Sequence, residues 1–107
     1  MAKDPDDWYA SPQIATFDWD PRKDETNQAK HGVTFAKAQE AWLDPKRVIL
    51  FDESHSTPAE RRYFCYGRVG QNVLTVRFTY RDGFIRIIGA GYWNKGRQIY
   101  ERENKIH

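Results

Sequence analysis

The sequence predicts an α+β domain in which helices come first and an antiparallel sheet follows. Asp20-Pro21 and Thr34 mark two helix starts within the first 45 residues. Beyond residue 47, apolar or alternating segments are separated by turn residues. One of these turns, Asp82-Gly83, is a strong signal for a two-residue hairpin. Helices followed by strands are typical of the α+β class, so the expected order is β-α-α-β-β-β-β-α.

Length and cysteine content indicate a single domain. The chain has 107 residues and one cysteine, Cys65, which leaves no internal disulfide and no cysteine metal cluster. Residues 1–15 contain two prolines and three aspartates with little periodicity. We therefore expect a flexible arm over 1–15 and the domain over 16–107. No signal peptide or membrane-spanning run is evident, so a cytoplasmic protein is expected.

The first elements follow from capping signals. Residues 17–19 are a candidate strand with aromatic side chains on one face. A helix is expected over 21–31, because Asp20 can accept hydrogen bonds at its start and Gly32 can end it in the left-handed conformation.

This first helix has almost no apolar stripe, and a helix that is polar all round is marginal by itself. One interpretation is a surface helix pinned through Ala29 and the aliphatic stems of its long side chains. The other is that the helix presents Lys30 and His31 beside the sheet.

The next segments predict a helix, a strand and a loop. Thr34 can cap the second helix, and Asp44-Pro45 ends it. The nearly continuous apolar run 47–51 predicts a strand covered on both sides. The loop 52–60 is rich in turn residues and carries His55.

Three antiparallel strands are expected over 61–89. In the second hairpin we expect Arg81 opposite Phe84, Thr79 opposite Arg86 and Arg77 opposite Ile88. Directly opposed residues share a face, and Cys65 is expected on the other, buried face. The arginine face, as we call it, is then Arg62, Arg68, Arg77, Arg81 and Arg86. Gly89-Ala90-Gly91 is expected to be a flexible exit before a last helix over 95–104.

Charge is divided unevenly along the chain. Up to residue 60 there are seven Lys/Arg and twelve Asp/Glu, and after it ten and three, which gives −5 and +7. Few acids are expected on the arginine face, so its arginines indicate a polyanionic ligand, and phosphate fits the guanidinium fork best. An ordinary solvated polar face is the alternative.

Several separated motifs together resemble a known family. They are FDWDPRKDETNQAKHGVTF, D-E-S-H-S followed by E-R-R, a G-R pair in a strand, and T-Y-R-D-G-F-I-R-I-I. Over residues 17–101 they are similar to the BrnT family, toxins of type II toxin–antitoxin modules with a RelE-like fold. The resemblance implies a ribonuclease that inhibits translation and arrests growth. It also implies a BrnA-type antitoxin that covers the toxin and binds the DNA of their operon, so that the toxin meets DNA only indirectly.

The resemblance also implies site residues. By motif, the candidate catalytic residues are Lys30 and His31 in K-H-G, Arg62 in E-R-R, Arg68 in G-R, and Arg81 and Arg86 in the last motif. Many relatives carry an arginine where this chain has Gly91. Lys95 or Arg97 could take its place.

RNA cleavage of this kind needs neither metal nor cofactor, because the 2′-hydroxyl of RNA is the nucleophile. The protein must position it, move protons and stabilise charge at the phosphorus. His31 or Lys30 is expected to transfer the proton, with His55 as the alternative. The further RNA-binding candidates are Arg77, Tyr66, Thr79, Lys95, Arg97 and His55. No metal-ligand spacing is present.

Two other functions stay open. In a non-catalytic RNA- or protein-binding module, the same arginines would bind phosphates while Tyr66 and Trp93 stacked on bases. Alternatively, the arginines would mainly dock an acidic surface of the antitoxin.

Overall fold

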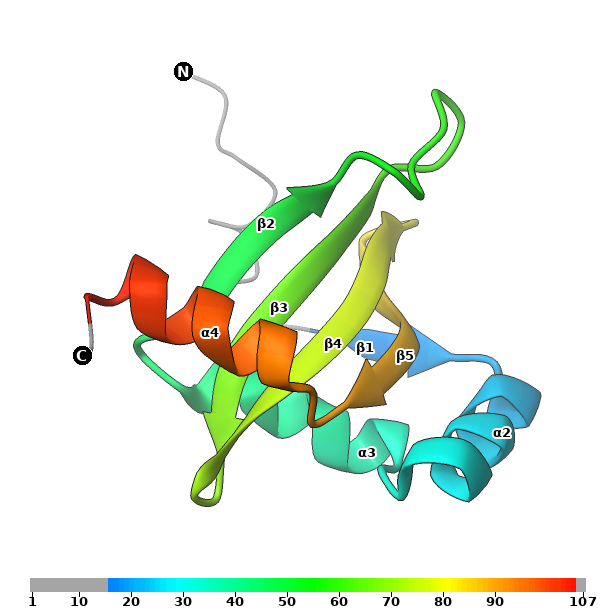
Figure 1. Ribbon diagram of the computed structural model, residues 1–107. Helices are drawn as coiled ribbons and strands as arrows, with labels where there is room; N and C mark the ends of the chain where they lie inside the picture. Colours follow the sequence, from blue (N-terminus) through cyan, green and yellow to red (C-terminus); the bar gives the residue numbers. More distant parts are fainter. Residues whose placement is uncertain (1–15, 106–107) are drawn as a thin grey trace.

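A single five-stranded sheet organises the chain. The computed structural model describes residues 16–105, and its strands lie in the order β1-β5-β4-β3-β2 (Figure 1). The elements are β1 (Phe17–Trp19), α2 (Pro21–His31), α3 (Phe35–Ala38), η1 (Gln39–Leu43), β2 (Val48–Asp52), β3 (Arg62–Val69), β4 (Asn72–Arg81), β5 (Phe84–Gly91) and α4 (Asn94–Glu103). This confirms the predicted α+β class and element order. The arm expected over 1–15 lies outside the described residues.

The sheet is mixed rather than wholly antiparallel. β2, β3, β4 and β5 pair antiparallel, but β1 runs parallel to β5. β1 and β5 are far apart in the sequence. A strand of three residues carries no pattern that would predict pairing with so distant a segment.

Helices lie on both faces of the sheet. α3 and the 3-10 helix η1 cover the face that holds the main core, where Phe35, Trp42 and Phe78 are fully buried. α4 crosses the opposite face (Figure 1). Its Tyr100 packs there in one cluster with Tyr66. α2 lies beside β5 at the end of the sheet. The opposite face is therefore covered by α4 over only part of its area.

The predicted caps of α2 are confirmed. The Oδ1 of Asp20 accepts a hydrogen bond from the backbone N–H of Arg22 at 2.9 Å, and Gly32 has a φ of 69°. These are local interactions between residues close in sequence.

Asn27, not Ala29, anchors α2, because Ala29 is exposed. Asn27 is the buried residue of this helix, with 7% of its surface exposed. Its Nδ2 donates to the carbonyl oxygens of Val33 and Ala90, at 2.9 Å each. Its Oδ1 accepts from the Ala90 N–H at 3.0 Å. One amide therefore ties the helix to the end of β5.

The second helix changes form after one turn, from α3 to η1. β3 passes very close to η1 at this point. A Cβ placed on Gly67 would lie 2.3 Å from the carbonyl oxygen of Ala41, so only glycine allows the contact.

Two expectations about the sheet are wrong. β2 is an edge strand and is not covered on both sides, since Phe51 is 49% exposed. The segment Gly89-Ala90-Gly91 is not a flexible exit but the end of β5, where Gly91 pairs with Thr75. Cys65 lies in the main core, as expected.

The hairpin register is confirmed near the turn and shifts beyond it. Arg81 faces Phe84 and Thr79 faces Arg86, but a bulge in β5 places Gly89, not Ile88, opposite Arg77. An inserted residue of this kind disturbs alternation locally. Glycine thereby comes to lie beside Arg77.

Candidate functional site

The arginine face exists, but it is not one continuous basic surface. Register places Arg62, Arg77, Arg81 and Arg86 on the side of the sheet opposite the main core. Their environments differ, and acidic side chains reach some of them from outside β3, β4 and β5.

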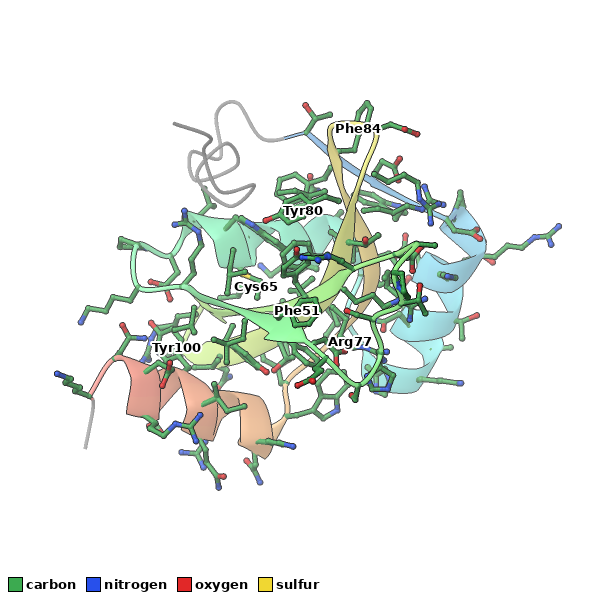
Figure 2. All side chains as sticks on the ribbon, turned by 90° about the horizontal axis from the view of Figure 1, so that it is seen from above. Phe51, Cys65, Arg77, Tyr80, Phe84 and Tyr100 are labelled. Atoms are coloured by element: carbon green, nitrogen blue, oxygen red, sulfur yellow. The ribbon has the colours of Figure 1, made fainter. Side chains whose placement is uncertain are left out.

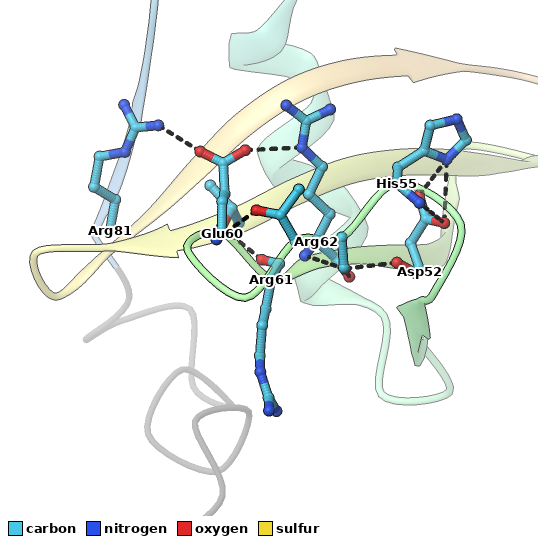
Figure 3. A network of polar contacts seen from close by, with 9 residues as sticks. Asp52, His55, Glu60, Arg61, Arg62 and Arg81 are labelled. Carbon is cyan, nitrogen blue, oxygen red and sulfur yellow. Dashed lines mark hydrogen bonds and ion pairs between the residues drawn. The ribbon is translucent and has the colours of Figure 1, made fainter.

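Two of these arginines share one carboxylate. The Nε of Arg62 and a terminal nitrogen of Arg81 each donate to Glu60 at 2.8 Å (Figure 3). Hydrogen bonds from Arg62 and Arg81 lower the pKa of Glu60, so it is ionised near neutrality. Asp18 on β1 pairs with Arg86. The expectation that acids are nearly absent from this face is therefore wrong, because Glu60 and Asp18 come from a loop and from β1.

Arg68 lies apart from the others. It is six residues further along β3 than Arg62, or about 20 Å at the usual rise per residue. Its guanidinium carbon is 5.6 Å from the centroid of the Tyr100 ring, on the side covered by α4. Arg68 thus lies on the predicted face of the sheet, but at its far end and beside α4.

Tyr66 and Thr79 are buried, with 4% and 2% of their surfaces exposed. Tyr66 packs beneath α4, and the hydroxyl of Thr79 donates to the carbonyl oxygen of Arg61 at 2.6 Å. Neither side chain is accessible to a ligand as the sequence-based hypothesis required. Strand alternation places both residues on the outer side of the sheet. There α4 covers Tyr66, and the chain around Arg61 covers Thr79.

His55 is held within its own loop. Its Nδ1 lies 2.9 Å from the Oδ2 of the buried Asp52, and its backbone N–H also points to that carboxylate (Figure 3). Burial by itself would raise the pKa of Asp52, but hydrogen bonds from Ser54 and His55 outweigh it and lower that pKa. These contacts indicate a structural role for His55, which stabilises the loop in which it lies.

A basic groove lies between α2 and β5, on the arginine face beyond α4. Its volume is about 340 Å³. Arg77 reaches it from β4, and Figure 2 shows this side chain between α4 and α2. The groove is lined by Arg22, Lys23, Thr26, Asn27, Lys30, His31, Arg77, Ile88, Gly89 and Trp93. No carboxylate occurs among these lining residues, so the cations give the groove a positive potential.

The bulge in β5 brings a glycine to the lining of this groove. It places Gly89 next to Arg77, where an added Cβ would sit 3.9 Å from the Cδ of Arg77 and 3.8 Å from the Oδ1 of Asn27. The aliphatic stem of Arg77 therefore crosses over glycine toward α2. Both distances are ordinary van der Waals contacts.

The C-terminal end of α2 meets the segment that follows β5. The His31 and Trp93 rings lie edge to face, with centroids 5.2 Å apart and planes at 82°. Lys30 and His31 thus line the same groove as Arg77. Basic residues at a helix C-terminus also interact favourably with the helix dipole.

Lys95 and Arg97 do not line the groove. Arg97 pairs with Glu101 along α4 at 2.8 Å, and Lys95 borders a separate hollow beside Trp93. At Gly91, an added Cβ would lie 2.4 Å from the Trp93 ring. The indole thus occupies the space next to Gly91.

Arg22 and Lys23 line the groove, although neither was among the predicted site residues. The available signal was helical spacing: Arg22, Thr26 and Lys30 form one row along α2, and Lys23, Asn27 and His31 form the adjacent one.

The described residues contain neither a metal-ligand cluster nor a helix that could cross a membrane. Within residues 16–105, no group of three His, Cys, Asp or Glu residues is placed to hold a metal ion. In the same residues, no helix has the length and apolar character needed to cross a membrane.

Comparison with known proteins assigns the chain to a family. A family model described as the ribonuclease toxin BrnT of type II toxin–antitoxin systems matches residues 19–96. No match was found among curated proteins. The matched region covers most of the chain and includes α2, β4 and β5, which form the groove. The chain therefore belongs to the BrnT family of ribonuclease toxins of type II toxin–antitoxin systems.

Proposed function

We propose that this protein is an endoribonuclease that cleaves RNA in the groove between α2 and β5. One observation carries the proposal: five basic side chains from α2 and β4 converge on the groove without a lining carboxylate. A polyanion would replace water there without displacing an internal ion pair, which is not true at Arg62, Arg81 or Arg86.

In this proposal Arg77 binds the phosphate at which cleavage occurs. It is half-buried and its stem lies over Gly89, so its planar fork can offer paired donors to two phosphate oxygens. Arg22, Lys23 and Lys30 are exposed around it and would hold neighbouring phosphates. Donors that are fixed in advance stabilise the charge that develops at phosphorus.

The reaction needs a proton acceptor and a proton donor but no metal. A base removes the proton of the 2′-hydroxyl, the 2′-oxygen attacks phosphorus, and the bond to the 5′-oxygen breaks. That leaving oxygen takes up a proton, so the products carry a 2′,3′-cyclic phosphate and a 5′-hydroxyl. We assign His31, with Lys30 beside it, to proton transfer, because imidazole is suited to this role near neutral pH.

The family membership extends the proposal to partners. A type II toxin has an antitoxin, and we propose that it is of the BrnA type and connects the toxin to operator DNA. We further propose a RelE-like arrangement, a cytoplasmic location and inhibition of translation as the result of RNA cleavage. The groove supports the proposed neutralisation by an antitoxin, because a protein that covered the groove would prevent RNA from binding there.

Arg77→Ala tests the assignment of the groove. We expect RNA cleavage to fall by about 100- to 1000-fold, the usual effect of removing one donor to the transition state. Arg102→Ala is the matched control, because Arg102 is an exposed arginine on α4 that does not line the groove. Analysis of product ends should show 2′,3′-cyclic phosphates, and a metal chelator should leave the rate unchanged.

Wild-type protein that retains RNA without cleaving it would support a non-catalytic binding module instead. Equal cleavage by Arg77→Ala and Arg102→Ala, with both variants folded, would move the site away from the groove.

A further inference from the structure

Trp93 lies between two hollows of different character. On one side is the basic groove. On the other is an apolar hollow of about 260 Å³, bordered by Phe64, Tyr66, Thr75, Trp93, Lys95 and Gly96. Trp93 is 37% exposed, although a large aromatic residue gains by burial. An accessible indole therefore borders a cationic groove.

The position of this indole is fixed by its neighbours. It lies against Gly91, where an added Cβ would be 2.4, 2.6 and 2.8 Å from three atoms of the ring. The His31 ring contacts it edge to face. Because both contacts are already made, little conformational entropy would be lost when a ligand stacks on the exposed part of the ring.

We propose that Trp93 is a base-stacking platform that holds one unpaired nucleobase of the RNA beside the phosphate bound at Arg77. This inference rests on the proposed function and names its substrate class: single-stranded RNA with a base free to leave its stack. Cationic side chains that follow the backbone, combined with an aromatic ring that takes a base, are the usual features of single-strand recognition. A base inside a duplex would first have to be unstacked.

Gly91 is part of this platform. A side chain at position 91 would collide with the indole, so the ring would have to move away from His31. Gly91→Ala should therefore weaken stacking in the same direction as removal of the ring. Trp93→Phe, which keeps an aromatic face, should restore part of it.

The experiment measures binding separately from cleavage. The probe is a short single-stranded oligouridylate in which every ribose is 2′-O-methylated, so that it cannot be cleaved. A second probe has the same backbone but abasic positions. Wild-type protein should bind the first probe about 5- to 150-fold more tightly, as expected for one stacked base. Trp93→Ala should bind both probes with similar affinity.

Tyr92→Ala is the matched control, because Tyr92 is the adjacent aromatic residue, is 46% exposed and borders neither hollow. It should retain the preference for the base-bearing probe. The inference is overturned if Trp93→Ala, still folded, keeps that preference. It is also overturned if Trp93→Ala weakens binding of the antitoxin but of neither RNA probe. This surface would then be a protein interface.

Failure of the proposed function would look different. RNA cleavage by wild-type protein is assayed in parallel. If wild-type protein does not cleave RNA, the ribonuclease assignment fails, whatever the probes show. If it cleaves and Trp93→Ala does not change the base preference, only the stacking platform is lost.

Discussion

At the scale of single residues, the groove differs from the rest of the arginine face in what surrounds its cations. Glu60 accepts from both Arg62 and Arg81, so a phosphate arriving there would compete with a carboxylate that is already in place. Arg77 lies among Lys30, His31 and other basic side chains instead. Like charges repel, and an incoming phosphate relieves that repulsion.

His31 provides the sharpest test at this scale. We expect His31→Ala to lower RNA cleavage by about 100- to 10,000-fold, the range for loss of a general acid or base. His55→Ala should retain activity, because His55 bonds to Asp52 within its own loop. Cleavage rates and thermal unfolding are measured for both variants. Full activity in both would remove histidine from the mechanism and leave Lys30 as the candidate.

At the scale of elements, local signals were sufficient for helix ends and the hairpin turn. Asp20 and Gly32 form their capping hydrogen bonds with residues no more than four positions away, so the sequence predicts these helix ends well. The turn at Asp82-Gly83 has positive φ at both residues, as its sequence indicates. Non-local features were not predictable. The parallel pairing of β1 and the bulge in β5 depend on which distant segment lies alongside.

The same distinction holds for the candidate site. Lys30 and His31 could be placed at a helix end beside the sheet, and they do line the groove with Arg77. The ion pairs of Arg62, Arg81 and Arg86 could not be foreseen, because their acids come from other elements. Burial of Tyr66 and Thr79 depends equally on what covers the sheet.

The attachment of α2 through Asn27 leads to a prediction at this scale. Asn27→Ala leaves two carbonyl groups and one N–H without their partner. We expect the free energy of unfolding to fall by about 1–3 kcal/mol, the cost of leaving a buried polar group unsatisfied. Amide exchange in α2 should accelerate more than in β3 or β4, because the Asn27 amide bonds to Val33 and Ala90 and to neither of these strands.

Cleavage should fall as well, because α2 carries four of the basic groove residues. Gln28→Ala is the control, since Gln28 is exposed on the same helix. Unchanged amide protection of α2 in Asn27→Ala would show that something else holds this helix.

At the scale of the whole molecule, the acidic first part and the basic second part of the chain have different roles. Residues up to 60 carry the excess of acid, and several of these acids hold elements together. The Oδ2 of Asp44 accepts from the Tyr100 hydroxyl at 2.6 Å and from the Arg68 N–H at 2.7 Å. Its Oδ1 accepts from the Lys46 N–H at 2.8 Å. One carboxylate thus joins the end of η1, β3 and α4.

These bonds make the fold sensitive to acid. Burial by itself would raise the pKa of Asp44, but hydrogen bonds from Tyr100, Arg68 and Lys46 outweigh it and place that pKa below its ordinary value. A carboxyl whose pKa is lower in the folded than in the unfolded state stabilises the fold above its ordinary pKa. That stabilisation is lost as pH falls through the folded pKa. The pKa values of Asp52 and Glu60 are lowered too, so we expect stability to decline below about pH 4.

Asp44→Asn isolates the contribution of Asp44. At pH 7 the variant should lose about 1–3 kcal/mol in free energy of unfolding, because hydrogen bonds to a charged acceptor are stronger than those to an amide. Urea unfolding from about pH 7 to about pH 2 should show this difference shrinking as the wild-type carboxyl becomes protonated. Glu53→Gln, at an exposed position, is the control and should follow the wild type throughout. A difference for Asp44→Asn that stays constant down to the lowest pH would mean that the shape of the side chain, rather than its charge, joins these three elements.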